Sequence, residues 1–358
     1  MRILLSGMVA GDPGQGGATA AVLQYARGFS RLGHDVMVVE PVDAPTPEVV
    51  SYFLELGLPR AALLVRSTRE TVGLGFEELA SFDAEVLINV SGILREPELT
   101  SAVPVRVYLD LDPVFIQLWH AQGVDVGLAG HTHYLTVGSD LARTGITLDR
   151  RWIPTLPPVV LEDWRPRRTL EHDAFTTVGN WRSYGSIQWR GKTFGQKAHA
   201  VRRLLELPGL TDERLAPALA IDAGEREDLN ALRAHRWELI DPAVVAGTPS
   251  LYRDFVAGSK GELGLAKAGY VDTRCGWFSD RSACYLASGR PVVAHDTGFG
   301  RFLPAGEGLV AFGNAVEAAA GIARVCADYE RHSSAARAIA ECHLDSDIVL
   351  GRLLESVL

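Results

Sequence analysis

The segment Ser279–Ser282 places one cation and three short polar side chains just before the largely apolar run Ala283–Ala287. This pattern predicts a short helix that Ser279 caps, with the N–H groups of Arg281 and Ser282 free at its start. Such a helix end attracts anions, and a guanidinium suits phosphate oxygens. We therefore expect Ser279, Asp280, Arg281 and Ser282 to bind phosphate. The alternative is a structural helix whose Asp280 and Arg281 face solvent or pair with each other.

The stretch "VGNW", residues 178–181, follows a predicted strand and is a second candidate for ligand contact. Ligands of open α/β sheets bind at the carboxyl ends of the strands. Gly179 allows close backbone approach, and Asn180 can donate to a phosphate or a ribose. Trp181 or Trp189 can stack on a base. The alternative is a turn flanked by core tryptophans.

The elements that must position these residues alternate between strand and helix in both halves of the chain. Residues 2–6, a glycine-rich loop, a helix ending near Gly33 and a strand over 36–39 form a βαβ unit. Further strands are expected at 84–90, 105–111, 126–130 and 134–138. A proline-rich crossing around Pro154–Pro166 predicts a linker.

The second half repeats the alternation and ends in a helix predicted over 334–358. The fold class expected is α/β, with two Rossmann-like, doubly wound domains facing each other across a cleft. The predicted domains are 1–170 and 171–335. Residues 336–358 are expected to pack back on the first domain.

Length and charge support two domains and narrow the partners. The 358 residues exceed the ~250–300 at which single cores stop growing. A net charge of −9 argues against a nucleic-acid or anionic-membrane binder, so we expect small-molecule partners and no nucleic acid.

The sequence predicts a cytoplasmic protein without a transmembrane segment. Its four cysteines lack CxxC spacing, which favours a reducing compartment. It also has no leader-like apolar run and no span of ~20 apolar residues.

Two stretches carry a resemblance to a known family. "GGATAAVLQYARGFSRLGHDV" and "CYLASGRPVVAHDTG" resemble the opening and the "EA.A.G.PVV" segment of the GT-B glycosyltransferases. The resemblance implies that domain 1–170 binds the acceptor and that domain 171–335 holds a nucleoside diphosphate sugar at the Ser279–Ser282 helix. It also implies no cofactor beyond that substrate.

The chain departs from the family's pattern at the paired glutamates that flank this helix in many retaining members. The corresponding positions are Gly276 and Cys284, so the donor-sugar contacts of those glutamates do not transfer. Glu262, in a Ser/Gly-rich segment expected to be a turn, resembles another family element that reaches sugar hydroxyls. A solvated turn is the alternative.

Further residues of the second half can serve the same site. Arg190 and Lys192 can add positive charge near the departing diphosphate, and Lys267 can approach a phosphate. Asp296 and Thr297 follow a strand and can contact sugar or acceptor, or form an Asx-type turn.

In the first half, Asp110, Asp112 and His131 stand near predicted strand ends and are the catalytic candidates. The two aspartates resemble the DxD metal motif of another glycosyltransferase fold. We expect no metal, because a helix terminus and cations already neutralise the leaving group. Acceptor recognition, a general base and a structural strand-end cap stay open for the aspartates. His131 can act as a base near neutral pH, although with His133 it can also suggest zinc.

The glycine loop before residue 18 is expected to reach the cleft through Gly16 and Gly17. A dinucleotide site with Glu40 as the ribose ligand is a competing interpretation. It is disfavoured because the third glycine of G-x-G-x-x-G is replaced by Thr19.

These patterns together predict a glycosyltransferase that moves a sugar from a nucleoside diphosphate sugar, of the UDP, TDP or GDP type, to an acceptor hydroxyl. The alternatives are a nucleotide-sugar epimerase or hydrolase of the same fold, a non-catalytic sugar-nucleotide-binding protein, and an NAD oxidoreductase.

Overall fold

The first half of the chain forms an eight-stranded sheet with the order β4-β3-β2-β1-β5-β6-β7-β8. The computed structural model describes residues 1–146 and 148–358. Every neighbouring pair in this sheet is parallel except β3 with β4. The strands are β1 (Arg2–Ser6), β2 (Asp35–Val42), β3 (Ala61–Val65), β4 (Thr71–Gly73), β5 (Val86–Val90), β6 (Val105–Asp110), β7 (His133–Thr136) and β8 (Trp152–Pro154).

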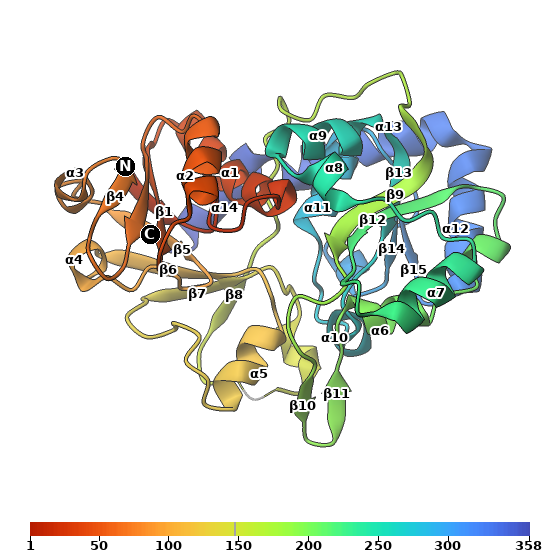
Figure 1. Cartoon of the computed structure of the whole chain (residues 1–358), viewed down its shortest axis with the longest axis horizontal. Helices are drawn as coiled ribbons and strands as arrows, with labels where there is room; N and C mark the ends of the chain where they lie inside the picture. The colour runs from red at the N-terminus through yellow and green to blue at the C-terminus, as the bar shows by residue number, and fades with distance from the viewer. Residues whose placement is uncertain (147) are drawn as a thin grey trace.

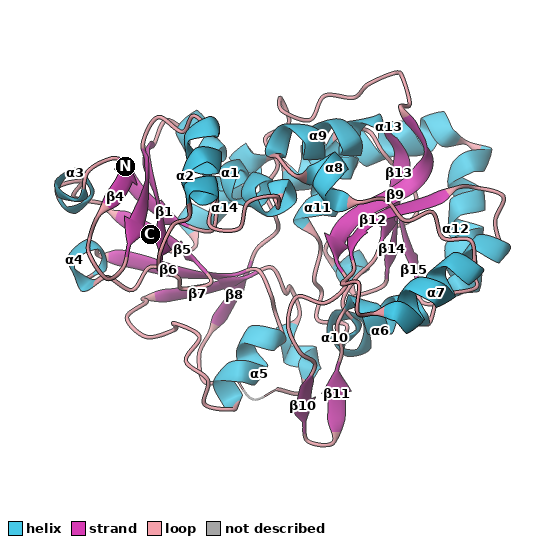
Figure 2. Cartoon of the chain, in the orientation of Figure 1, coloured by secondary structure: helices cyan, strands magenta, loops and turns pink. Residues whose placement is uncertain are grey.

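Helices cover this sheet, as Figure 2 shows. They are α1 (Gly16–Arg31), α2 (Pro47–Glu55), α3 (Phe76–Ala80), α4 (Pro97–Thr100), α5 (Phe115–Ala121) and the 3₁₀ turn η1 (Leu141–Thr144). Helix α1 forms where the sequence predicts it, because Val22, Tyr25 and Phe29 bury one apolar face and Gly33, at φ 80°, ends the segment.

The second half forms a five-stranded parallel sheet with the order β12-β9-β13-β14-β15 and a separate hairpin, β10-β11. Figure 1 shows the two sheets in separate lobes, with the hairpin projecting beside α5. The strands are β9 (His172–Asn180), β10 (Ile187–Trp189), β11 (Lys192–Phe194), β12 (Leu215–Ala220), β13 (Ser259–Gly264), β14 (Val292–His295) and β15 (Leu309–Phe312).

Helices lie on both faces of this second sheet (Figure 2). The helices of the second half are α6 (Lys197–Arg202), η2 (Leu207–Gly209), α7 (Arg226–Ala234), α8 (Pro242–Ala246), α9 (Pro249–Gly258), α10 (Ala268–Thr273), α11 (Asp280–Ala287), η3 (Phe299–Arg301), α12 (Ala315–Ala327), α13 (Tyr329–Ile339), the π-helical turn η4 (Ala340–Leu344) and α14 (Ser346–Glu355). Two open α/β sheets facing each other confirm the predicted fold class.

Three element predictions were wrong, and the third, a turn at Glu262, lies in strand β13 (Ser259–Gly264). Residues 126–130 form no strand, because Gly127 and Gly130 adopt φ of 74° and 81°. The single C-terminal helix is instead broken at Asp345, whose side chain caps α14 and whose neighbours pair with Val159.

After that break, α14 packs on the first lobe. Leu350 and Leu353 are buried in the hydrophobic core that the first sheet forms with α1 and α2. A Cβ added at Gly28 of α1 would lie 2.4 Å from Leu350 Cδ1, so glycine permits this close contact. Across the described residues, no helix has the length and apolarity needed to cross a bilayer.

Candidate active site

A cavity of about 1130 Å³ lies between the carboxyl ends of the two sheets. The first lobe lines it with the segments after β1, β5 and β6, and the second lobe with the ends of β9, β12 and β13 and the start of α11. Pockets for one small ligand usually measure roughly 300–1,000 Å³, so this cavity lies just above the upper end of that range. It is the expected ligand position for two facing α/β sheets.

Arg281 forms one side of a cationic corner in this cavity. Its Nε donates to Glu262 Oε1 over 2.5 Å, and its Nη1 donates to the carbonyl oxygen of Val178 over 2.9 Å. Its Nη2 is buried and has no hydrogen-bond partner among the described residues. Since a buried N–H group normally has a partner, this nitrogen is an unused donor beside the cavity.

Lys197, the first residue of α6, completes the corner. A Cβ added at Gly179 would lie 2.4 Å from Lys197 Nζ and 3.8 Å from Arg281 Nη1, so both cations converge on the end of β9. Lys197 is 8% exposed, and no described residue accepts a hydrogen bond from its Nζ or pairs with it. Burial, and then the charge of Arg281, lower the pKa of Lys197 well below its usual range. An anion in the cavity would reverse that shift.

The start of α11 adds backbone donors. Ser279 caps the helix, because its Oγ accepts from the N–H of Arg281 over 3.2 Å. The amides of Asp280 and Ser282 have no acceptor among the described residues. The two free amides are thus those of Asp280 and Ser282, whereas the sequence predicted those of Arg281 and Ser282.

Asp280 is a carboxylate of this corner that lines the cavity. Burial raises its pKa, and neighbouring Glu262 raises it further, while Arg281 opposes the shift.

Asp112 joins the two lobes at the cavity wall. Its Oδ2 accepts from Lys267 Nζ over 2.8 Å and from the hydroxyl of Tyr184, and its Oδ1 accepts from the hydroxyl of Tyr270. Lys267 Nζ also lies 2.6 Å from the Tyr184 oxygen. Both oxygens of this first-lobe carboxylate are therefore occupied by second-lobe groups.

No protein-family model matches this sequence, and no curated protein sequence matches it. Solved structures do match over the whole chain. An α-glucosyltransferase in complex with UDP and a 13-mer DNA containing a HMU base has a TM-score of 0.66 at 11% identity, covering 100% of this chain and 99% of that one. The HepE protein of Anabaena with UDP and glucose has a TM-score of 0.60 at 13% identity, covering 99% of each chain. A glycosyltransferase from Rickettsia africae has a TM-score of 0.56 at 12% identity, covering 99% and 97%.

The chain has the GT-B fold. This confirms the resemblance that the two sequence stretches carried. One expectation is corrected by the same structures: the α-glucosyltransferase of this GT-B fold is a complex with DNA, so the exclusion of nucleic acid was wrong. The net charge of −9 sums over the entire chain, whereas binding depends on the charges of one surface.

In this GT-B chain the three catalytic candidates lie in different places, and only one of them lines the cavity. Asp112 lines the cavity, but Asp110 is fully buried outside it and accepts from the N–H of Asp112, Gln117 Nε2 and Thr136 Oγ1. Burial raises the pKa of Asp110 to about 7. Asp110 is therefore the strand-end cap that the sequence left open, and it holds the segment that presents Asp112.

His131 does not reach the GT-B cavity. Its Nε2 lies 3.0 Å from Asn89 Nδ2, and its Nδ1 lies 3.3 Å from the Leu128 carbonyl oxygen. Burial lowers its pKa. The geometry places His131 behind the loop after β5 rather than beside a substrate. Among the described residues no cluster of three His, Cys, Asp or Glu side chains could hold a metal ion.

The glycine loop meets the other lobe rather than a dinucleotide. The amides of Val9, Ala10 and Gly11 donate to the Glu40 carboxylate over 2.9, 2.7 and 2.9 Å, so Glu40 already fills the anion site of this loop. Gly16 is buried against the second lobe and does not line the cavity. Gly17 lines it beside the Tyr252 ring.

Several predicted donor contacts do not reach the cavity. Trp181 is a core residue whose Nε1 donates to Asp228 Oδ2 over 2.8 Å. Arg190 and Lys192 are exposed on the β10-β11 hairpin, outside the cavity lining. Glu262 lies in β13 rather than in a turn and is fully buried. It contacts the site through its ion pair with Arg281.

Three further predicted contacts, Ser282, Asp296 and Thr297, do not line the cavity. Ser282 is buried outside the lining, although its amide is free. Asp296 pairs with Arg274 and accepts from the N–H of Gly298, in the Asx-type turn left open by the sequence. The Thr297 hydroxyl donates to the carbonyl oxygen of Trp277. Gly179, Asn180, Lys267, Ser279, Asp280 and Arg281 do line the cavity.

Sequence reasoning missed Lys197. A lysine opening the small, apolar helix start "GQKAHA" was the available signal, since a charged residue is rarely buried without a purpose.

Proposed function

We propose that this protein is a glycosyltransferase that transfers a sugar of the hexose class from a UDP-sugar to an acceptor hydroxyl. The observation that supports it is the cationic corner formed by Lys197, Arg281 and the free amides of α11 in the cavity between the lobes. Three solved proteins of the same fold are glycosyltransferases or carry UDP, which supports the donor class.

The corner suits the leaving group of such a transfer. The bond from the anomeric carbon to the diphosphate breaks, its electron pair stays on UDP, and the acceptor oxygen bonds to that carbon. Lys197, Arg281 and the two amides would stabilise the charge that develops on the diphosphate. Asp280, which lines the cavity and has a raised pKa, would take the acceptor's proton.

The hydrogen bonds that Glu40 accepts disfavour an NAD site in the first lobe. Glu40 occupies the three loop amides that a pyrophosphate would need, and a second anion there would be repelled.

The decisive experiment is a calorimetric titration of UDP into wild type, Lys197→Ala and the control Lys192→Ala, which removes an exposed lysine outside the cavity. We expect at least about a tenfold loss of affinity for Lys197→Ala, because a charge-assisted contact is removed, and no change for Lys192→Ala. Equal affinities would overturn the proposed site.

A turnover assay distinguishes an enzyme from a protein that binds the sugar nucleotide without catalysing its reaction. UDP release from UDP-glucose, with and without acceptor, should depend on Lys197. Tight UDP binding with no UDP release on any acceptor would instead indicate a non-catalytic sugar-nucleotide-binding protein.

A further inference from the structure

The first lobe presents one continuous wall to the cavity. Strands β1, β5 and β6 are neighbours in the sheet, and the segments that follow them all line the cavity. We call the residues nearest these strand ends the first-lobe wall: Met8, Val90, Ser91, Ile93, Leu111 and Asp112. All are apolar except Ser91 and Asp112. The polar residues Asp12 and Gln15 of the glycine loop also line the cavity, outside this wall, and Gln15 Nε2 donates to Asp12 Oδ2 over 2.7 Å.

The polar capacity of this wall is small. Both oxygens of Asp112 are occupied by Lys267, Tyr184 and Tyr270. The Ser91 hydroxyl has no partner among the described residues, so it is the wall's unengaged side-chain hydrogen-bonding group there. Met8, by contrast, is 42% exposed and offers only apolar surface and a weak acceptor.

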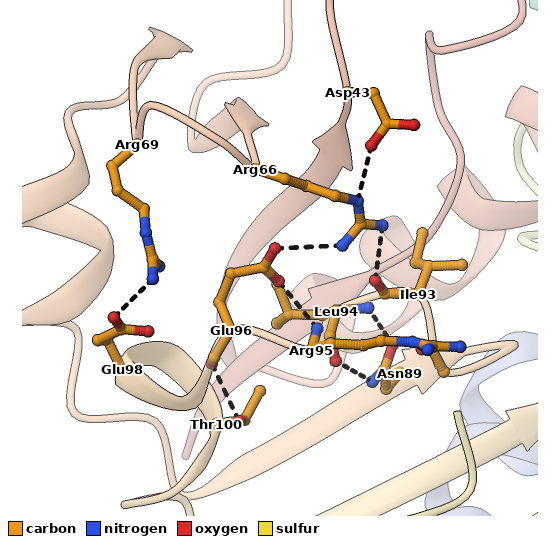
Figure 3. A network of polar contacts seen from close by, with 11 residues as sticks. Asp43, Arg66, Arg69, Asn89, Ile93, Leu94, Arg95, Glu96, Glu98 and Thr100 are labelled. Carbon is orange, nitrogen blue, oxygen red and sulfur yellow. Dashed lines mark hydrogen bonds and ion pairs between the residues drawn. The ribbon is translucent and has the colours of Figure 1, made fainter. Parts of the chain in front are cut away.

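Hydrogen bonds hold the loop that follows β5, around Ile93 and Leu94, as Figure 3 shows. Asn89 accepts from the N–H of Leu94 over 3.1 Å and donates to its carbonyl oxygen over 2.8 Å. Arg66 donates to the Ile93 carbonyl oxygen over 2.9 Å and pairs with Glu96 over 3.1 Å. The loop therefore cannot easily turn other polar groups toward the cavity.

Ser91 also keeps an unfavourable backbone conformation, with φ at 55°. Glycine would adopt this conformation without strain, so the serine side chain has a cost at this position. Strained residues of this kind concentrate at functional sites.

We propose that the acceptor group entering this cavity is largely apolar and carries a hydroxyl that Ser91 orients, rather than being a polyhydroxylated sugar. The inference rests on the proposed function, in which the donor fills the second-lobe half. A sugar against this wall would lose its water contacts at several hydroxyls and regain one, whereas an apolar group loses none.

The test uses 4-methylumbelliferone, a hydroxylated aromatic, titrated into the UDP-saturated protein and compared with glucose and maltose. We expect the aromatic probe to bind at least about tenfold more tightly than either sugar. Ile93→Asn and Leu111→Asn should each weaken probe binding about tenfold, as expected for lost apolar contact. The control Leu54→Asn, at a 60% exposed position on α2, should leave probe binding unchanged.

Ser91→Gly provides an independent variant, because glycine suits the φ of this residue. This variant should keep the melting temperature and the UDP affinity of wild type, while its affinity for the probe should be lower. UDP affinity within twofold of wild type serves as the folding check for every variant.

Tighter binding of glucose or maltose, or faster transfer from UDP-glucose to them than to the probe, would overturn the inference. Unchanged probe binding in folded Ile93→Asn and Ser91→Gly would also overturn it. Failure of the proposed function looks different: UDP then fails to bind, or binds independently of Lys197.

Discussion

Lys267 Nζ of the second lobe lies 2.8 Å from Asp112 Oδ2 of the first, directly at the cavity wall. The side chains are 16% and 21% exposed, so solvent screens this pair little. The two lobes of the GT-B fold are thus tied together by a charge pair beside the substrates.

Asp112→Asn should loosen the closed arrangement of the lobes. The neutral amide keeps the shape but loses the charge attraction to Lys267. We expect a larger radius of gyration in small-angle X-ray scattering and roughly a tenfold lower kcat/KM for the proposed reaction, since closure excludes water and aligns the substrates. Asp83→Asn, at an exposed ion pair with Arg2, is the control. An unaltered radius of gyration together with unaltered kcat/KM would contradict the role.

UDP binding should take up a proton through Lys197. Its pKa is lowered in the free protein, and a bound diphosphate raises it. Between those two pKa values affinity therefore falls as pH rises. Calorimetry in buffers of different ionisation enthalpy should detect the proton uptake in wild type, and none from this group in Lys197→Gln. Equal uptake in both proteins would assign the proton elsewhere.

The free energy of unfolding should depend on pH through Asp110. Its pKa is raised to about 7 in the folded chain, whereas an unfolded aspartate titrates near 3.8. The folded state therefore holds the proton more tightly, and this stabilisation is complete below about pH 4 and is lost as pH rises through 7. The loss is at most about 1.4 kcal/mol per pH unit. Urea unfolding from pH 4 to 8 should show this slope in wild type minus Asp110→Asn. A flat difference would mean that the pKa of Asp110 is ordinary.

Gly16→Ala should weaken the contact between the lobes. An added Cβ would lie 2.2 Å from the carbonyl carbon of Thr248, and backbone cannot move aside as a flexible side chain does. We expect about 1–3 kcal/mol lower unfolding free energy and a lower UDP affinity. Gly300→Ala, whose nearest contact would be an ordinary 3.6 Å, is the control. Equal stability of the two variants would show that the lobes meet less closely.

Local patterns in the sequence determined the secondary-structure elements and the N-terminal end of α11, which forms part of the proposed site. The spacing of Val22, Tyr25 and Phe29 produces α1, and Ser279 caps α11 as expected. These features depend on residues within one or two turns of each other, so a linear reading suffices for them.

Only the tertiary structure decided which side chains act together. Lys197 meets Arg281 because β9, α6 and α11 converge, and Asp112 meets Lys267 across 155 positions of sequence. Glu262 was placed in a turn by its Ser/Gly-rich neighbours, but pairing with β9 and β14 made that segment a strand. Long-range packing and burial set these contacts and the pKa values that follow, and neither quantity is encoded in local spacing.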